Sequence, residues 1–286
     1  MYFSNAASYR EWRAAKLDNY PSRAEDLLVR IGGLNELDSS AMSAIRSSCK
    51  RANMAIYTCV DAAVDRAAIR NFAGHFGLRR LDHHLCANDD GVSELTASCE
   101  DRRSAYVPYS RHSLSWHTDG YYNNESSRVH AVVLHCVQNA ATGGENALLD
   151  PEIAYIRLHD ADPAFIEAFE HPGCMTLPAN VEDGHQIRPA VSGPVFSYGQ
   201  SGEALHMRYS ARKKNIRWRD DPTTLAAREF LSDLLADENS PVLRHRLQPG
   251  EGLISNNVLH NRTTFEDGPA QKRLLYRARF FDRIDS

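Results

Sequence analysis

From residue 104 onward the chain is a succession of short apolar segments, each with the length and residue types of a β-strand. Gly, Pro and Asn separate these segments, and only two helical patterns interrupt them, near 151–170 and 222–238. Many short strands without regular β-α alternation are typical of a sandwich or a jelly roll with helices packed outside. The expected strands are 104–109, 129–137, 146–150, 174–177, 194–198, 204–209, 242–247, 252–260 and 273–281.

The first part of the chain has a different pattern, in which apolar residues recur at three- and four-residue spacing. The expected elements are helices at 8–31, 40–55 and 61–78, a strand at 54–60 and loops over 82–104. With 286 residues and 42% hydrophobic content, the chain can bury a sizeable core. The sequence predicts a mainly β fold with flanking helices, as a single domain over 1–286. A largely helical part at 1–80 precedes a jelly-roll core at 81–286 (a double-stranded β-helix).

Composition argues against several classes of function. A net charge of −4 is a poor match for bulk binding to nucleic acid or to an anionic membrane. No apolar run approaches the roughly 18–20 residues of a membrane span, and the N-terminus has no signal-peptide core, so an ordinary first helix is expected there rather than a transit peptide. The six cysteines include no C-x-x-C pair, which argues against a cysteine zinc site. Because no secretion signal is recognisable, reduced thiols in a cytoplasm are expected. A small-molecule partner is expected, and the sequence leaves open whether the chain forms a homo-oligomer.

The stretch SLSWHTDGYYN at 113–123 holds two candidate metal ligands, His117 and Asp119. Residues two apart on an extended chain point to the same face, so both side chains can bind one ion. The triplet alone is weak evidence, because chance supplies about one H-x-D triplet in a chain with this many histidines. A second histidine, His260, follows an expected strand that begins at PGEG. Two imidazoles and one carboxylate suit Fe(II), but zinc hydrolases use the same set, so the ligands alone do not choose the metal.

Three arginines, Arg273, Arg277 and Arg279, stand at even spacing in the expected strand RLLYRARF and so share one face. Buried arginines are costly unless an anion meets them. The segment between His260 and Arg273 is long enough for a hairpin that returns the chain beside the metal, where a guanidinium can hold a carboxylate with two hydrogen bonds. The alternative is an exposed edge strand whose arginines are solvated.

Four motifs, in this order along the chain, resemble those of the Fe(II)/2-oxoglutarate dioxygenases of the taurine dioxygenase (TauD/TfdA-like) type. They are YSRHSLSWHTD (109–119), TGGEN (142–146), LQPGEGLISNNVLHNRTTF (247–265) and RLLYR (273–277). The resemblance covers roughly residues 80–282. Within that family, the motifs are most similar to the γ-butyrobetaine and trimethyllysine hydroxylase branch.

The resemblance implies a double-stranded β-helix with the metal inside and a set of site residues. His117, Asp119 and His260 would be the Fe(II) ligands. Arg273 would hold the distal carboxylate of 2-oxoglutarate, with Asn146 in a position where relatives often have threonine. O2 would be the second cosubstrate, and an unactivated C–H bond would be hydroxylated with succinate and CO2 as coproducts.

Other residues match positions that line the pocket in relatives, and two departures stand out. Tyr109 matches a pocket tyrosine of the betaine branch, and Arg277 matches a position that meets an anionic substrate group in the taurine-like branch. The chain shows no sign of the N-terminal zinc module of the betaine enzymes. Gly120 stands where those enzymes have an aromatic residue that encloses trimethylammonium.

The substrate is expected to be a small polar metabolite, zwitterionic or anionic. Trp116, Tyr121 and Tyr122 could form an aromatic wall that attracts a cation, or they could simply pack in the core. Arg277 favours an anionic group as well. The basic stretch 208–219 is expected to be a solvated loop, with a lid or a nucleic-acid contact as alternatives.

Three other functions stay open on the sequence alone. A zinc hydrolase could use the same three ligands but has no use for Arg273. A binding protein could retain the jelly roll without catalysis. An oxygenase could act on a macromolecular side chain, which only the basic stretch supports.

Overall fold

The computed structural model describes residues 6–84, 87–97, 106–182, 184–199, 204–212 and 214–284. Helices and sheets are mixed in it, and strands are numerous, so the prediction of a mainly β fold is only roughly right. The chain divides into two compact units. Unit 1 consists of Met1–Tyr20, Trp116–Arg128 and Leu149–Val242, and unit 2 of Pro21–Ser115, Val129–Leu148 and Leu243–Ser286. Whether the two make one domain stays a prediction.

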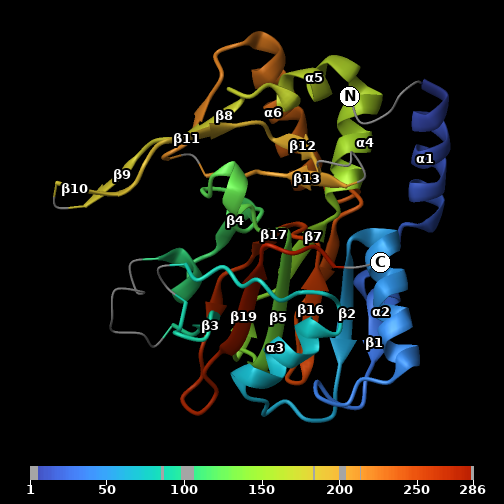
Figure 1. The fold of residues 1–286 in the computed structure, drawn as a ribbon, viewed down its shortest axis with the longest axis vertical. Helices are drawn as coiled ribbons and strands as arrows, with labels where there is room; N and C mark the ends of the chain where they lie inside the picture. The colour runs from blue at the N-terminus through green and yellow to red at the C-terminus, as the bar shows by residue number, and fades with distance from the viewer. Residues whose placement is uncertain are drawn as a thin grey trace. The chain divides into compact units, whose positions relative to one another are not determined.

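Unit 2 is built on a six-stranded sheet, whose strands lie side by side in Figure 1. In spatial order they are β1 (Leu28–Arg30), β2 (Met54–Thr58), β16 (Glu251–Ser255), β5 (Ala131–Gln138), β19 (Leu274–Phe280) and β3 (Val92–Leu95). Only β1 and β2 are parallel, and every other neighbouring pair is antiparallel. Strand β19, which carries the arginines at even spacing, is therefore an inner strand and not the exposed edge strand considered as an alternative.

One face of this sheet is covered by α2 (Ser39–Ala52) and α3 (Arg66–Gly74), which share a hydrophobic core with it. Each helix begins at an aspartate whose side chain accepts a backbone N–H of the first turn, Asp38 in α2 and Asp65 in α3. The predicted helix over 61–78 is shorter than expected, because the cap at Asp65 sets its first turn. Even-numbered residues of β19, such as Ala278, face this core, which leaves its arginines on the other face.

A second sheet of four strands carries both histidines that the sequence singled out. Its order is β15 (Leu243–His245), β7 (Asn146–Leu149), β17 (Leu259–Arg262) and β4 (Leu114–His117). The predicted single strand 252–260 is wrong, since it is two strands, β16 and β17, in different sheets. The break lies at Asn256 and Asn257: Asn257 has a left-handed backbone (φ 50°), and Asn256 hydrogen-bonds Asn53 through its backbone and its side chain.

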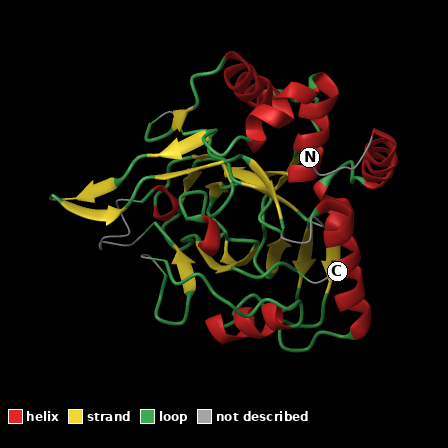
Figure 2. Cartoon of the chain, turned by 45° about the horizontal axis from the view of Figure 1, so that its top comes forward, coloured by secondary structure: helices red, strands yellow, loops and turns green. Residues whose placement is uncertain are grey.

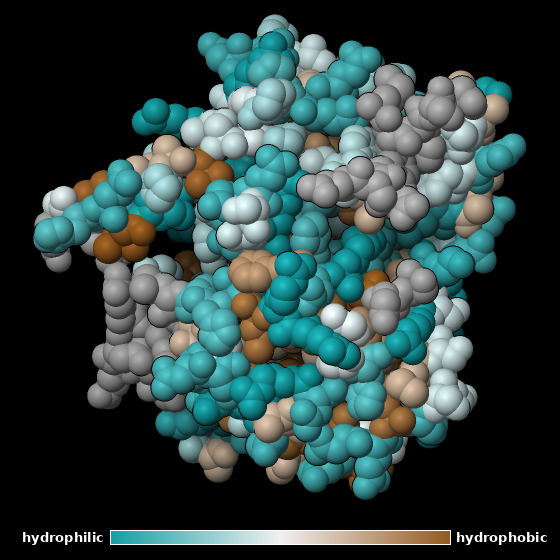
Figure 3. Space-filling view, viewed as in Figure 1, coloured by the Kyte–Doolittle hydropathy of each residue, from teal (hydrophilic) through white to brown (hydrophobic). Residues whose placement is uncertain are grey.

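Unit 1 contains α1 (Ala6–Asn19), η4 (Glu125–Ser127), α4 (Pro151–Ala161), α5 (Pro163–Glu170) and α6 (Pro222–Ala236). The last three helices share one N-terminal signal, an aspartate cap followed by proline. These three helices pack together near the top of Figure 2. Its strands are β8 (Met175–Leu177), β9 (Asn180–Glu182), β10 (His185–Arg188), β11 (Val191–Gly193), β12 (Phe196–Tyr198), β13 (Leu205–Met207) and β14 (Arg217–Trp218). Apolar surface is visible on the β9–β10 hairpin (Figure 3), where Val181 and Ile187 are exposed.

Two further expectations are wrong. The predicted helix over 8–31 ends at Asn19 and is followed by a 3-10 turn, η1 (Ala24–Leu27), and β1, because Pro21 cannot continue the helix. Of the predicted strand 104–109, the described part is a 3-10 turn, η3 (Val107–Tyr109), with Pro108 in its first turn; residues 104 and 105 lie outside the described residues. Among the described helices, none has the length and apolar character needed to cross a membrane.

Candidate active site

His117 is the last residue of β4, and Asp119 follows it in a turn at Gly120. This short segment is held by hydrogen bonds to Tyr209: the Thr118 N–H donates to the Tyr209 carbonyl over 3.0 Å, and the Tyr209 N–H donates to Thr118 Oγ1 over 3.1 Å. His117 also forms an isolated bridge with Ser210. The extended backbone places His117 and Asp119 on one side of the chain, with 3.7 Å between His117 Nε2 and Asp119 Oδ1.

His260 lies on β17, which is the neighbour of β4 in the four-stranded sheet. The turn before it is anchored by Asn257, whose side-chain amide donates to the carbonyl of Val129 over 2.7 Å. His260 Nδ1 lies 2.9 Å from the Val258 carbonyl, so this nitrogen is the protonated donor. The Nε2 atom then carries the lone pair, as a metal-binding imidazole requires.

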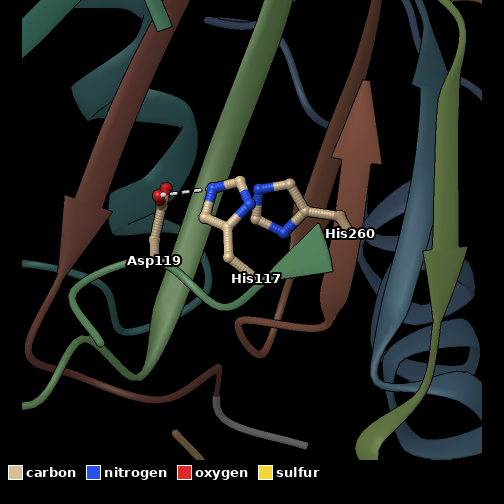
Figure 4. Close-up of side chains that lie close together, drawn as sticks. All are labelled: His117, Asp119 and His260. Carbon is tan, nitrogen blue, oxygen red and sulfur yellow. Dashed lines mark ion pairs between the residues drawn. The ribbon is translucent and has the colours of Figure 1, made fainter. Parts of the chain in front are cut away.

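His117, Asp119 and His260 each offer one ligand atom, and these atoms lie within 4.8 Å of one another (Figure 4). His117 is 9% exposed and Asp119 5% exposed, so the group is largely withdrawn from water. Two neutral imidazoles and a carboxylate match the donor set of a divalent metal such as Fe(II) or Zn(II). The residues therefore fit a resident metal ion, and they supply too few ligands to fill an octahedral coordination sphere.

Unit 2 also contains a small cavity of about 10 Å³, room for one water-sized group. Both predicted cosubstrate residues line it, Arg273 and Asn146. Arg273 is 4% exposed, its Nη1 is buried without a hydrogen-bond partner among the described residues, and burial lowers its pKa to about 10. A buried guanidinium with an unused donor is costly unless an anion meets it, so this cavity has the charge to attract an oxygen atom of a carboxylate.

The glycines of the TGGEN motif line this cavity and let two segments of the chain approach closely. Gly143 ends β6 (Thr142–Gly143), which pairs with β18 (Phe265–Glu266), and it has a left-handed backbone (φ 69°). A Cβ at this position would lie 2.1 Å from the carbonyl oxygen of Thr264. Phe265 then stacks under the arginine, with its ring centroid 4.9 Å from Arg273 Cζ.

Gly143→Ala is expected to destabilise the protein by about 1–3 kcal/mol, because the new Cβ clashes and the backbone becomes strained. Urea denaturation measures this change. Gly74→Ala is the control: a Cβ there meets nothing within 4 Å, and Gly74 is in a helix, so the exchange is expected to be neutral or stabilising. Equal midpoints for Gly143→Ala and the wild type would contradict the close approach of the two strands.

Arg273, which immediately precedes β19, and Arg277 and Arg279 within β19 differ in their surroundings. Arg279 is 2% exposed and donates from Nη2 to Asp82 Oδ2 over 2.5 Å, so a buried carboxylate neutralises it. Arg277 is 7% exposed. No described residue forms an ion pair with Arg273, so an external anion would satisfy its unused donor.

The family model described as "Taurine catabolism dioxygenase TauD, TfdA family" matches residues 30–279 of the chain. The protein belongs to the TauD/TfdA family. It is thereby an oxidoreductase of the dioxygenase class, and Fe(II), 2-oxoglutarate and O2 are the metal and the cosubstrates of that class.

Solved structures similar to this TauD/TfdA member support the same fold at low sequence identity. Asparagine oxygenase in complex with Fe(II), (2S,3S)-3-hydroxyasparagine and succinate is 16% identical, with a TM-score of 0.58 over 89% of this chain and 93% of that one. The non-heme iron oxygenase OrfP, as a variant bound to (3S)-hydroxy-L-arginine, is 16% identical, with a TM-score of 0.61 over 85% and 80%. The enzyme AAD-2 in complex with Mn(II) and N-oxalylglycine is 14% identical, with a TM-score of 0.61 over 93% and 98%.

Arg262 is a structural residue of this TauD/TfdA member that the sequence did not single out. It lies two residues after His260 on β17 and is 3% exposed. Its guanidinium donates to three carbonyls of the segment that leads into β4: those of Pro108 (3.3 Å), Ser110 (2.9 Å) and His112 (2.5 Å). The Phe265 ring lies 4.8 Å from its Cζ, so Phe265 contacts the guanidinium of Arg262 as well as that of Arg273.

Arg262→Met is expected to weaken metal binding by roughly tenfold or more, because groups that orient metal ligands contribute ten- to a hundredfold in affinity. The reason is that the segment before β4 loses three hydrogen bonds from a charged donor. Metal titration monitored by calorimetry measures the effect. Arg244→Met on exposed β15 is the control, and equal metal affinity in the two variants would show that Arg262 has no part in holding the segment.

The predicted aromatic residues lie partly buried near His117. The ring centroid of Tyr121 is 6.2 Å from that of His117, and the rings are nearly perpendicular. Tyr122 packs edge-on against Tyr121 at 5.3 Å, and Trp116 is half-buried in β4. Arg212 Nη1 donates to the hydroxyl of Tyr121 over 3.3 Å, so these tyrosines lie beside a cation and are a less suitable site for a second one.

Two other predicted assignments need comment. Tyr109 is 3% exposed in η3 and is not among the residues that line the cavity of Arg273, so its role in cosubstrate binding stays a prediction. Within the basic stretch, Arg208 is not solvated as expected. It is 7% exposed and donates to the carbonyls of Tyr121, Met175, Val191 and Gly193. Burial lowers the pKa of Arg208 to about 10.

Proposed function

We propose that the protein is an Fe(II)/2-oxoglutarate-dependent oxygenase that hydroxylates an unactivated C–H bond of a small amino acid or a similar carboxylate-bearing metabolite. The observation that carries this proposal is the group of His117, Asp119 and His260, whose ligand atoms lie within 4.8 Å of one another. In an oxygenase of the TauD/TfdA family, this donor set suits a ferrous ion that still needs open positions for cosubstrates.

His117, Asp119 and His260 would hold the metal, and each has a defined task. The carbonyl of Val258 keeps His260 in the tautomer with a free Nε2 lone pair. Asp119 supplies the negative charge that two neutral imidazoles lack. With its cosubstrates bound, the metal supplies the oxidising power for inserting oxygen into a C–H bond, and succinate and CO2 are the coproducts.

Arg273 and Asn146 would bind the distal carboxylate of 2-oxoglutarate. The unused donor on Arg273 Nη1 can form a charge-assisted hydrogen bond, and the side-chain amide of Asn146 can donate a second one. Both residues line the same small cavity, so they would orient one end of the cosubstrate and exclude water from it. Burial makes this interaction stronger than it would be in bulk water.

The substrate class rests on the comparisons and on the charge near the tyrosines. Two of the similar structures hold hydroxylated amino acids, asparagine in one and arginine in the other. Arg212 bonds the hydroxyl of Tyr121 here, and Arg188 lies close enough to Tyr121 and Tyr122 to interact electrostatically. This positive environment favours a substrate carboxylate over a trimethylammonium group. Trp116 and Arg277 are further predicted contacts of the substrate. Gly120, in place of the aromatic residue that encloses trimethylammonium in the betaine enzymes, agrees with that preference. Assignment to the γ-butyrobetaine and trimethyllysine branch therefore rests on the similarity of the motifs alone.

The fold we propose for this chemistry is a double-stranded β-helix. The largely antiparallel six-stranded sheet and the four-stranded sheet are compatible with a jelly roll. Helices α2 and α3 then cover its outer face.

Turnover measurements test the proposed function. Purified protein with Fe(II), 2-oxoglutarate and air is incubated with the common amino acids one at a time, and succinate and hydroxylated product are quantified. Formation of both in equal amounts with one of these amino acids is expected. Ester or amide cleavage in the presence of Zn(II) and without O2 would contradict the proposal and indicate a hydrolase instead.

A further inference from the structure

A second guanidinium, that of Arg246, lines the same cavity as Arg273. Its Nε is buried and has no hydrogen-bond partner among the described residues, as is also true of Arg273 Nη1. Its Nη2 donates to the carbonyls of Ala140 (2.5 Å) and Ala141 (3.3 Å), which fixes the plane of the group. The cavity therefore has two cationic walls, each with one unused buried donor.

No described residue forms an ion pair with Arg246 or Arg273. Asp267 acts on Arg273 electrostatically, but its carboxylate accepts the backbone N–H of Arg273 over 2.8 Å and lies 3.7 Å from Arg111. An anion held in the cavity would meet an unused donor from each guanidinium.

The backbone around Arg246 is braced by a chain of amides. Gln271 Nε2 donates to Asn139 Oδ1 over 2.9 Å and to the Ala140 carbonyl over 3.1 Å. Asn139 Nδ2 donates to Gln248 Oε1 over 2.9 Å, and Gln248 Nε2 donates to the carbonyl of Arg246 over 2.8 Å. Segments 139–141 and 246–248 are thus tied together, so Arg246 is presented to the cavity by a supported backbone and not by a loose loop.

We infer that Arg246 is a second binding residue for the distal carboxylate and makes the enzyme selective for 2-oxo acids that carry one. One carboxylate oxygen accepts from Arg273 Nη1 and the other from Arg246 Nε, so both unused donors are satisfied by the same anion. This inference rests on the proposed function and adds a specificity determinant to it. A 2-oxo acid without the distal carboxylate would leave both guanidiniums unpaired, which is the basis of the discrimination.

The test compares two ligands on the Mn(II)-loaded protein by calorimetry: 2-oxoglutarate, and 2-oxovalerate, which has the same chain without the distal carboxylate. The variant Arg246→Gln is expected to bind 2-oxoglutarate roughly ten- to a hundredfold more weakly, as the loss of a hydrogen bond to a charged group predicts. Its affinity for 2-oxovalerate and for Mn(II) is expected to stay within about threefold of the wild type. Arg246→Lys keeps the charge but lacks Nε, so its affinity for 2-oxoglutarate is expected to lie between that of the wild type and that of Arg246→Gln. This second variant guards against misfolding of Arg246→Gln.

Arg244→Gln is the matched control, because Arg244 is exposed on β15 only two residues away. Arg246→Gln with the 2-oxoglutarate affinity of Arg244→Gln would overturn the inference and leave the proposed function standing. Failure of the Mn(II)-loaded wild type to bind 2-oxoglutarate at all would overturn both.

Discussion

Asp119→Ala is expected to abolish turnover and to weaken metal binding by about a hundredfold or more. The carboxylate is the only negatively charged group among the three clustered ligands, and it is 5% exposed. Loss of a group that merely orients a metal ligand already costs ten- to a hundredfold in affinity, so loss of a ligand should exceed that. Two neutral imidazoles remain, and they bind a divalent ion without compensating its charge.

Calorimetric titration with Mn(II) under anaerobic conditions measures the affinity, and succinate release measures turnover. His112→Ala is the control, since its side chain is exposed and only its backbone carbonyl is used by Arg262. Wild-type metal affinity in Asp119→Ala would show that these three residues do not form the metal centre.

Arg273→Met is expected to remove 2-oxoglutarate binding without a loss of stability. A buried guanidinium with an unused donor costs desolvation energy, and methionine fills similar volume without that cost. The free energy of unfolding of the ligand-free variant is therefore expected to equal or exceed that of the wild type. The additional melting shift that N-oxalylglycine causes in the Mn(II)-loaded wild type is expected to disappear, while the shift caused by Mn(II) alone is expected to remain.

Arg279→Met, on β19 just after Arg273, is the matched control, and the opposite pattern is expected for it. Arg279 is equally buried but pairs with Asp82, so its removal leaves an uncompensated buried carboxylate and costs about 3–5 kcal/mol. Chemical denaturation of both variants measures the contrast. If Arg273→Met were as destabilised as Arg279→Met, Arg273 would be a structural residue and not one kept for a ligand.

The parts of the fold that the sequence predicted are those whose signal is local. Strands β5 and β19 are continuous apolar or alternating runs, and both lie within a few residues of the predicted bounds. The helices that begin with aspartate and proline were expected in the right places for the same reason. The strand over 252–260 failed because its break depends on Asn256 and its partner Asn53, which are far apart in the sequence.

In the candidate site, too, the residues with a local sequence signal could be predicted and those that depend on remote segments could not. The H-x-D triplet, His260 and Arg273 were proposed because their residue types and order form a known pattern, and the structure places the three ligands together. Arg246 and Arg262 carry no motif of their own, since an arginine beside a strand is usually solvated. Their acceptors are backbone carbonyls from remote segments, which no local pattern in the sequence reveals. Arg208 was misplaced for the same reason.

The most direct measurement is an anaerobic calorimetric titration of 2-oxoglutarate into the wild type, Asp119→Ala and Arg273→Met, each with and without Fe(II). Binding of one 2-oxoglutarate per chain is predicted for the wild type only when Fe(II) is present, and no binding is predicted for either variant. Equal binding with and without the metal, or undiminished binding in both variants, would contradict a centre in which His117, Asp119 and His260 hold iron and Arg273 holds the cosubstrate.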